Sequence, residues 1–566
     1  MMYLNKLSKL ININLKKYTF IFISLFILTA FFEIFGLSTI LLFLNEIISQ
    51  GENSEMSKKF YNFLSENFNI KKNDYLILIT IILFLVFLIK NLIIFFLEIF
   101  KNKFFAKSQK LLSSKLYNDF LDADYQKYTK STASKLLTNI ITEVENIFQN
   151  ILQSVFVFYS EIFIFLSIFI FLIIYNFKVT LFLGVVFALI VITLAKFIKK
   201  KNILWGRKRQ VSLEELNLII TKSFSSFKEI KLNNTENFLK SIFLENAKNF
   251  SNSIAFLNTI QNIPRLFFEI VIIGLVCALI LFFLIIDSQL ESILITITVF
   301  AAAAIRLAPT ANRIYVNSTT KEFFQISLES VLSQIKLFKL QKKNKKIKKV
   351  NLKTFESIKL KNVKFKYKEK RTKNILNIKN LYLLNGKTYC IVGPNGSGKT
   401  TFLDLLCGLL QPTDGKITIN GKDLNKINLS NVISYCPQEP YVFSDTIIKN
   451  IIGDKKINNK NLRQSLEISG IKHVFKKNNN FLNLKLGANA INLSGGQKQM
   501  INIAKTLYQN KHILIFDEPT SYLSDQISKK FIEAIQKIKN DKLIIVCSHN
   551  KSLFKYFDKI IDIRKF

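Results

Sequence analysis

The chain has 566 residues, which is long enough for two or more domains. It is 49% hydrophobic, yet it carries 79 Lys and Arg against 39 Asp and Glu. This mixture favours an apolar membrane part joined to a charged soluble part over one uniform globular domain. The five cysteines include no CxxC pair, so we expect neither a cysteine-held metal nor a disulfide scaffold.

The formal net charge of +40 would suit either an anionic membrane surface or nucleic acid. The chain is also saturated with Lys, Ile, Asn and Phe, whose codons are rich in A and T. Codon drift therefore accounts for much of the charge, and membrane anchoring accounts for most of the rest. Because apolar runs fill the first half of the chain, we expect no nucleic-acid partner.

Six apolar runs precede the charged second part, and each is long enough to cross a hydrocarbon core of about 30 Å as a helix. They lie near residues 18–48, 75–100, 151–175, 178–198, 265–287 and 290–312. The first run is too long for a cleavable signal peptide. Lys6, Lys9, Lys16 and Lys17 precede it, so the amino end should stay inside the cell. The Lys-rich connections 101–150 and 199–264 would then be cytoplasmic and helical.

The predicted outer segment Glu55–Ile70 has its own pattern. Phe60, Phe63, Leu64 and Phe68 recur at helical spacing with charged and polar residues between them. The segment is either an amphipathic helix in the outer membrane interface or a helix packed on the ends of the spans.

A basic stretch at 336–350 separates the apolar half from an α/β pattern. We therefore expect an all-α transmembrane domain of six helices at 1–335, a linker at 336–355 and an α/β P-loop domain at 356–566. Short β-branched runs predict strands at Ser357–Phe365, Thr388–Val392, Ile433–Tyr435, His512–Phe516 and Lys542–Cys547.

Residues Gly393–Thr400 match the phosphate-binding pattern GxxxxGK[ST] between a strand and a predicted helix that begins at Lys399. The glycines let backbone N–H groups surround phosphate oxygens, and the helix N-terminus adds partial positive charge. Lys399 should bridge the β- and γ-phosphates of ATP, and Thr400 should bind Mg²⁺. The apolar strand His512–Phe516 ends in two carboxylates, Asp517 and Glu518. We expect Asp517 to hold Mg²⁺ through water and Glu518 to act as the general base toward the attacking water.

The stretch Leu493–Gln497 reads Leu-Ser-Gly-Gly-Gln, and together with the P-loop it resembles the signature of ABC transporters. The resemblance implies that Gln438 is the Q-loop residue at the metal, that His549 is the switch histidine and that Tyr367, or failing it Phe365, stacks on adenine. The implied nucleotide site comprises Tyr367, Gly393, Asn395, Gly396, Ser397, Gly398, Lys399, Thr400, Thr401, Ser494, Gly495, Gly496 and Gln497, with Thr400, Gln438 and Asp517 at the metal and Glu518, His549 and Gln438 in catalysis.

Six spans followed by an ATPase domain are similar to the type IV exporter branch of that family. The resemblance implies cytoplasmic coupling helices near 120–128 and 225–231. In this family the signature of one ATPase domain closes over the nucleotide of another. Because the P-loop and the signature each occur once, the resemblance implies a homodimer.

Some positions depart from the family pattern. Met500 stands where Arg is common, and Gly487-Ala488 replaces a Gly-Glu pair. The D-loop reads Ser521-Tyr-Leu-Ser524, with Asp525 one place late. The catalytic groups remain, so we expect hydrolysis, while these departures bear on coupling across the dimer.

Arginine is scarce, with eight Arg at 207, 209, 265, 306, 313, 371, 463 and 564 in a chain rich in Lys. Arg265, Arg306 and Arg313 lie in the fifth and sixth predicted spans, and the last two share a helical face. Charge in a membrane usually faces a cavity or a partner, and Arg suits bidentate contact with phosphate. The two interpretations are a substrate pyrophosphate, or anchoring and pairing with Glu33, Glu161 or Glu269.

Glu33, the outer segment and the three arginines together resemble the lipid-linked oligosaccharide flippases of bacterial N-glycosylation. That resemblance implies ATP-driven movement of an undecaprenyl-diphosphate oligosaccharide from the inner to the outer leaflet of the bacterial inner membrane, for protein glycosylation. The alternative is an ABC exporter of another amphiphile, such as a lipid A precursor, a peptide or a drug. A non-transporting ATPase on nucleic acid and an importer fit the six spans less well.

Overall fold

The computed structural model describes residues 15–49, 72–129, 132–285, 290–339, 350–352, 354–367, 375–475, 480–487 and 493–566. The chain divides into two compact units, one helical and one α/β, with the division between Leu340 and Gln341. The outer segment 55–70, Arg371, Ala488 and most of the basic stretch 336–350 lie outside the described residues.

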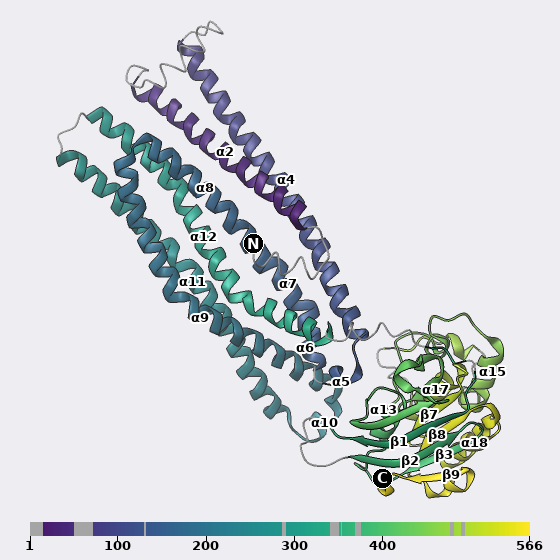
Figure 1. Ribbon diagram of the computed structural model, residues 1–566. Helices are drawn as coiled ribbons and strands as arrows, with labels where there is room; N and C mark the ends of the chain where they lie inside the picture. The colour runs from purple at the N-terminus through teal and green to yellow at the C-terminus, as the bar shows by residue number, and fades with distance from the viewer. Residues whose placement is uncertain are drawn as a thin grey trace. The chain divides into compact units, whose positions relative to one another are not determined.

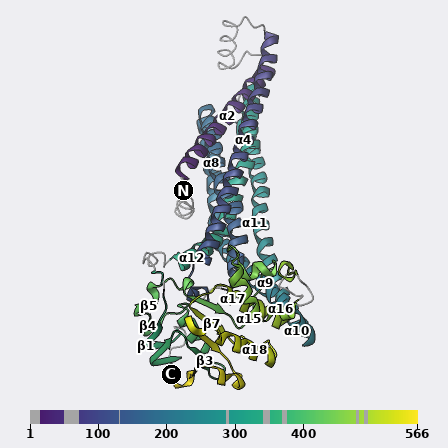
Figure 2. The same cartoon turned by 90° about the vertical axis from the view of Figure 1, so that its right-hand side faces the viewer.

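Long helices that pack along one another build the helical unit (Figures 1 and 2). Their bounds are α2 (Leu15–Ser49), α4 (Lys72–Leu121), α8 (Gln153–Tyr175), α9 (Phe177–Ser225), α11 (Glu236–Ile285) and α12 (Leu290–Lys339). The described residues of the six predicted apolar runs fall within them, except Ile151 and Leu152, which belong to the segment before α8. α4, α9, α11 and α12 extend well beyond the apolar runs that predicted them, whereas α2 nearly matches its run. α8 is continued toward the amino end by α6 (Ala133–Thr138) and α7 (Val144–Asn146).

Three helical stretches among the described residues are long and apolar enough to cross a membrane: Phe20–Ile40, Ile77–Leu121 and Ala133–Tyr175. Many of their large apolar side chains are exposed, such as Phe31, Phe84 and Ile174. Helices with apolar side chains on their outer surface are typical of a lipid-facing bundle. Six membrane crossings stay a prediction.

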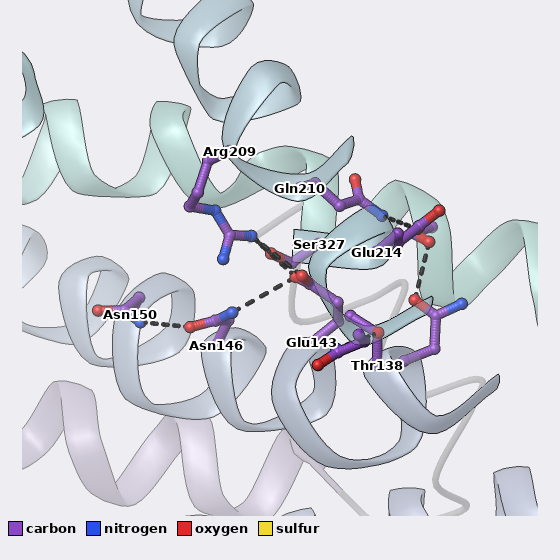
Figure 3. Close-up of polar contacts among 11 residues, drawn as sticks. Thr138, Glu143, Asn146, Asn150, Arg209, Gln210, Glu214 and Ser327 are labelled. Atoms are coloured by element: carbon purple, nitrogen blue, oxygen red, sulfur yellow. Dashed lines mark hydrogen bonds and ion pairs between the residues drawn. The ribbon is translucent and has the colours of Figure 1, made fainter. Parts of the chain in front are cut away.

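Buried polar side chains lie within an otherwise apolar core where α9 and α12 pack on the stretch before α8. Two π-helical segments, η1 (Asn139–Glu143) and η2 (Ile147–Leu152), interrupt that stretch. Glu143, at the end of η1, is fully buried, and its two carboxylate oxygens accept from Arg209 Nη2 at 3.1 and 3.0 Å. The same nitrogen donates to Ser327 Oγ at 3.2 Å, so one guanidinium joins three helical segments (Figure 3). Substitution of either member of this buried ion pair would leave the other charge unpaired, which is strongly destabilising.

Two short helices lie where the coupling helices are expected. α5 (Tyr125–Tyr128) follows the end of α4, within the expected segment 120–128. α10 (Phe227–Leu232) overlaps the expected segment 225–231. Their role in coupling stays a prediction.

The α/β unit contains a parallel sheet of strand order β6-β7-β8-β3-β9 and an antiparallel sheet of order β2-β1-β4-β5. The expected strands agree with β1, β3, β6, β7 and β8. The strands are β1 (Ser357–Phe365), β2 (Leu376–Leu384), β3 (Thr388–Val392), β4 (Asp414–Ile419), β5 (Lys422–Asp423), β6 (Ile433–Cys436), β7 (Ile513–Asp517), β8 (Leu543–Cys547) and β9 (Lys559–Asp562). β3, β7 and β8 are almost fully buried, as expected for parallel strands covered on both faces.

Helices of the α/β unit contribute to three buried cores, and α18 packs in the one that contains Phe516 and Val546. α13 covers the sheets, where Phe402 and Leu405 pack with Ile391 and Ile545 in the main core. α14 to α17 share a second core with Met500, Ile501 and Phe481, on the opposite side from β1, β4 and β5 (Figure 2). The helices are α13 (Lys399–Leu406), α14 (Ile447–Ile452), α15 (Asn459–Ile468), α16 (Ile471–Val474), α17 (Gly495–Tyr508) and α18 (Asp525–Gln536).

Candidate functional site

The predicted catalytic residues meet at the carboxyl edge of the parallel sheet. Asp517 at the end of β7 pairs in register with Cys547 at the end of β8, and Cys547 pairs with Ile391 of β3. Gly393, Glu518 and His549 follow directly after these three strand ends or one residue later. The carboxyl edge of a parallel sheet is where such folds bind ligands, so the topology gathers motifs that are far apart in sequence.

The loop from Gly393 to Gly398 forms a cradle that is closely packed at Gly393 and Gly398. Gly396 and Gly398 have positive φ angles of 78° and 96°, and a Cβ on Gly393 would lie 2.5 Å from Ser397 Oγ. That hydroxyl is buried and has no hydrogen-bond partner among the described residues. A buried donor without a partner beside a helix N-terminus fits a phosphate oxygen.

The ammonium of Lys399 lies inside this cradle. It donates to the carbonyl oxygens of Gly393 at 2.9 Å and Pro394 at 3.2 Å, and it lies 2.9 Å from His549 Nε2. No carboxylate forms a salt bridge with it among the described residues, although the charge of Asp517 lies close enough to interact with it. This arrangement suits a multiply charged anion such as a nucleotide triphosphate.

Glu518 is the centre of the predicted catalytic set. Its carboxylate lies 3.0 Å from His549 Nε2 and accepts a hydrogen bond from Gln438 Nε2 at 3.1 Å. Its backbone is left-handed, with φ of 46°, a conformation that non-glycine residues adopt rarely and mainly at functional sites. The structure therefore brings the expected general base, switch histidine and Q-loop glutamine into direct contact.

Asp517 is buried beside Glu518 and makes two polar contacts. It accepts from the hydroxyl of Tyr435 at 3.2 Å and from the side chain of Thr400. Burial raises the pKa of Asp517, and the neighbouring charge of Glu518 adds to the effect. A bound cation would oppose that shift.

The polar groups near Asp517 fit Mg²⁺ held mainly by water and phosphate. No cluster of three His, Cys, Asp or Glu side chains forms a metal site within the described residues. Mg²⁺ in nucleotide sites needs only one or two protein ligands, because phosphate and water oxygens complete the octahedron. The Thr400 hydroxyl, the Asp517 carboxylate and the Gln438 amide provide oxygens of the right kind.

Tyr367 has the exposed ring that adenine stacking requires. Its ring is 43% exposed, whereas Phe365 is buried in the core of the unit. The two rings meet edge to face at 5.0 Å, and the Tyr367 hydroxyl lies 3.4 Å from Thr401 Oγ1. Phe365 therefore packs against the Tyr367 ring from the core, and the exposures of the two rings favour Tyr367 over Phe365 for stacking on adenine.

The signature residues form the first turn of α17. Ser494 caps the helix by accepting from Gln497 N at 3.2 Å, and Gln497 Oε1 accepts from Ser494 N at 2.8 Å. This reciprocal capping box fixes the entry of the helix. Gly495 and Gly496 both lie against Tyr522 of the D-loop. Asn395 is exposed in the P-loop.

The departures from the family pattern have visible local structures. Met500 is buried in the core around α17, where an apolar side chain packs well. Ser524 stands at the N-cap position of α18 without a side-chain capping bond, and Asp525 is the first residue of that helix. Asp525 Oδ1 accepts from Asn550 Nδ2 at 3.3 Å.

Two of the three arginines predicted for a substrate pyrophosphate form ion pairs with acids in the helical unit. Arg306 contacts Glu33, which also accepts from Lys90 Nζ at 3.0 Å. Arg313 Nε lies 3.0 Å from Glu161 Oε1. In both pairs the acid is almost fully buried, whereas Arg306 is 40% and Arg313 49% exposed. The pairing that the sequence left open is therefore present for both residues.

Two cavities lie beside these groups. One, of about 240 Å³, is lined by Glu33, Lys90, Arg306 and Ile305. The other, of about 790 Å³, is lined by Arg265, Glu269, Phe268 and Ile305 among other, mostly apolar residues. Ile305 lines both, so the cavities are neighbours on either side of α12.

Two contributors were missed at the sequence level. Tyr435 was assigned only to a strand, although it immediately precedes the Cys-Pro-Gln segment that contains Gln438. Lys90 was passed over, although it interrupts the apolar run 75–100, and a lone charge there signals a buried partner.

Comparison with known proteins identifies the family. Residues 19–306 match the ABC transporter transmembrane region, and residues 376–521 match the ABC transporter domain. The chain belongs to the ABC transporter family. It is an ATP-hydrolysing transporter whose ATPase unit contains the P-loop and signature described above.

Its relatives include exporters. A protein of Rickettsia prowazekii named "Putative export ATP-binding/permease protein" is 25% identical over 83% of this chain and 82% of its own. A Rickettsia typhi protein of the same name is 37% identical, but the match spans only 37% of each chain. The solved structure titled "Structure of a bacterial Atm1-family ABC exporter with ATP bound" has a TM-score of 0.75 at 16% identity, covering 97% of this chain and 93% of that one. The chain therefore has the fold of an ABC exporter half-transporter.

Proposed function

We propose that two copies of this chain form an ATP-driven flippase in the bacterial inner membrane. Its cargo is an undecaprenyl-diphosphate-linked oligosaccharide, which moves from the inner to the outer leaflet. The observation that carries the proposal is the pair of half-exposed arginines, Arg306 and Arg313, on one face of α12.

The arginines are suited to a diphosphate because each is held on one side only. Glu33 and Glu161 bind them from the buried side, and the exposed side of each guanidinium keeps free N–H donors. Arg265 lines the neighbouring cavity from α11. Phosphate oxygens accept paired hydrogen bonds from guanidinium groups, which Lys does not reproduce.

ATP hydrolysis in each site would use residues of both copies. Lys399 and the P-loop glycines bind the phosphates, Tyr367 stacks on adenine, and Thr400, Asp517 and Gln438 bind Mg²⁺. Glu518 orients the attacking water, and His549 contacts the γ-phosphate. Ser494–Gln497 of the second copy complete the site, because the chain has a single signature.

A second candidate is export of another amphiphile, such as a lipid A precursor, a peptide or a drug. The mostly apolar lining of the larger cavity, which includes Phe268 and Ile305, favours acyl chains or hydrophobic compounds without requiring a phosphate. The names of the Rickettsia relatives state export and no cargo.

Reconstitution into proteoliposomes tests the proposal. The bilayer contains a lipid-diphosphate oligosaccharide with a labelled glycan, and ATP is added outside. We expect ATP to protect the glycan from an external glycosidase. Absence of protection above that of the hydrolysis-deficient Glu518→Gln variant would refute the flippase.

Substitution of Arg306 or Arg313 by Ala separates the two candidates. Loss of charge-assisted contacts to phosphate should slow flipping by about tenfold or more, while basal ATPase activity persists. A peptide or drug exporter would tolerate both changes. Arg463→Ala, on the exposed face of α15, is the control for loss of a guanidinium.

A further inference from the structure

The D-loop segment from Ser521 to Asp525 is fixed at three points in the ATPase unit. Ser521 N donates to the carbonyl of Glu518 at 3.3 Å. The ring of Tyr522 lies against the signature glycines, and Asp525 accepts from Asn550 at 3.3 Å. The segment thus touches the catalytic loop, the signature and the residue that follows His549.

The contact between Tyr522 and the signature has no spare space. A Cβ on Gly495 would lie 3.0 Å from Cδ1 of the Tyr522 ring. A Cβ on Gly496 would lie 2.8 Å from the backbone carbonyl oxygen of Tyr522. Side chain and backbone of Tyr522 therefore bound the first turn of α17 from one side.

The position of this contact gives it a chemical consequence. Gly495 and Gly496 open α17, so their backbone N–H groups belong to the end of the helix that attracts phosphate. Tyr522 is linked through Ser521 to Glu518, which contacts both His549 and Gln438. A shift of the ring would move the signature turn relative to the catalytic loop of the same chain.

We propose that Tyr522 is a positioning residue for ATP hydrolysis, and that its ring holds the signature turn of α17 in place. The inference rests on the ATPase activity alone, so it stands or falls independently of the cargo.

The proposed role of Tyr522 is tested by comparing kcat for ATP hydrolysis with the Kd for ATP. The full-length protein in lipid nanodiscs is assayed as wild type, Tyr522→Ala and Tyr522→Phe. We expect Tyr522→Ala to lower kcat for Mg-ATP about tenfold or more, since small misplacements of catalytic groups have large effects on rate. The Kd for ATP measured without Mg²⁺ should change less than about twofold, because the P-loop is untouched. Tyr522→Phe retains the ring and should retain the wild-type rate.

Controls separate positioning from folding. Tyr382→Ala removes a ring of similar exposure, 48% against 49%, from strand β2 and should leave kcat unchanged. Thermal unfolding of each variant checks that the ATPase unit is intact. If Tyr522→Ala does not fold, Tyr522→Leu takes its place, because Leu lacks the ring but fills part of the volume. Wild-type turnover in the variant without a ring would overturn the proposal, and so would an equal loss in Tyr522→Phe.

A double substitution tests the contact itself. Gly495→Ala should lower kcat because its Cβ meets the Tyr522 ring, and adding Tyr522→Ala should recover part of the loss. Gly496→Ala meets a backbone oxygen instead, so Tyr522→Ala should not rescue it. Absence of rescue at Gly495, or equal rescue at both glycines, would overturn the assignment of the ring as the constraint.

Discussion

Functional cations in the two units of the chain have different partners. In the ATPase unit the described hydrogen bonds of Lys399 are with two carbonyl oxygens and an imidazole. None of these groups is an anion, so an added anion can pair with the ammonium. In the helical unit Arg306 and Arg313 already hold the carboxylates of Glu33 and Glu161. Lys399 is itself buried, at 8% exposed, so carbonyl dipoles hold its charge, whereas the half-exposed Arg306 and Arg313 have carboxylate partners. An anion can therefore bind at Lys399 without displacing a carboxylate, whereas the anionic cargo proposed above would have to compete with Glu33 and Glu161.

The strongest test of the comparison disables the ATPase unit alone. Glu518→Gln keeps the shape of the side chain but removes the carboxylate that accepts a proton from water. We expect ATP hydrolysis to fall by about 10²–10⁴-fold while ATP binding persists, as measured by phosphate release and equilibrium binding. Glu533→Gln, on the exposed face of α18, is the control. Residual hydrolysis above a tenth of the wild-type rate would show that Glu518 is not the base.

Asp558 in the ATPase unit allows the stability that a paired carboxylate contributes to be measured. Although burial opposes the shift, hydrogen bonds from Lys539 and Thr388 lower the pKa of Asp558 to about 2 from its model-compound value of 3.8. Because the folded-state pKa is lowered, the stabilisation is complete above about pH 4 and is lost as the pH falls through about 2. Asp558→Asn should destabilise the unit by roughly 2 kcal/mol at pH 7.

Denaturant unfolding of wild type and Asp558→Asn across pH 2–7 checks this prediction. The difference between the two proteins should shrink as the pH approaches about 2. A difference that stays constant over this range would show that hydrogen-bond geometry, and not charge, carries the stabilisation.

The smallest expected effect concerns the internal carboxylates. Glu161→Gln releases Arg313 from a pair in which Arg313 is 49% exposed. We expect the concentration of lipid diphosphate that half-maximally stimulates ATPase activity to fall by about fivefold, because solvent at the half-exposed Arg313 screens the pair to on the order of 1 kcal/mol. Glu98→Gln is the control for loss of a paired acid elsewhere in the helical unit, where Glu98 is 46% exposed and pairs with Lys101. Unchanged or weaker stimulation would mean that Glu161 does not compete with the cargo.

The nucleotide site was predictable because its residues follow buried strands within short motifs. Gly393, Glu518 and His549 each stand at or near a strand end, and parallel strands bring their ends together. Tyr435 escaped notice because its hydroxyl reaches Asp517 across strands, which no local pattern encodes. The antiparallel strands β2, β4 and β5 and the parallel edge strand β9 were also missed, since strands with exposed lysines and asparagines resemble loops.

The helical unit was less predictable for a physical reason. Hydropathy locates the apolar runs and their approximate ends, because length and composition are local properties. Which acid meets which arginine depends on helix rotation and packing, so the choice among Glu33, Glu161 and Glu269 stayed open. The Tyr522 contact is similar, because the sequence marks the D-loop as unusual without revealing the glycine that its ring touches.

The buried group around Glu143 also bears on how the chain is made. Glu143 and Arg209 are 66 residues apart, and Ser327 follows Arg209 by another 118. During synthesis Glu143 therefore emerges from the ribosome long before its cationic partner, and the helical stretch around it cannot reach its final packing until α9 has formed. The site closes fully only with α12, the last long helix before the ATPase unit. Folding of this region is thus tied to completion of the helical unit, and nascent chains that stop before Ser327 should be recognised by quality-control proteases.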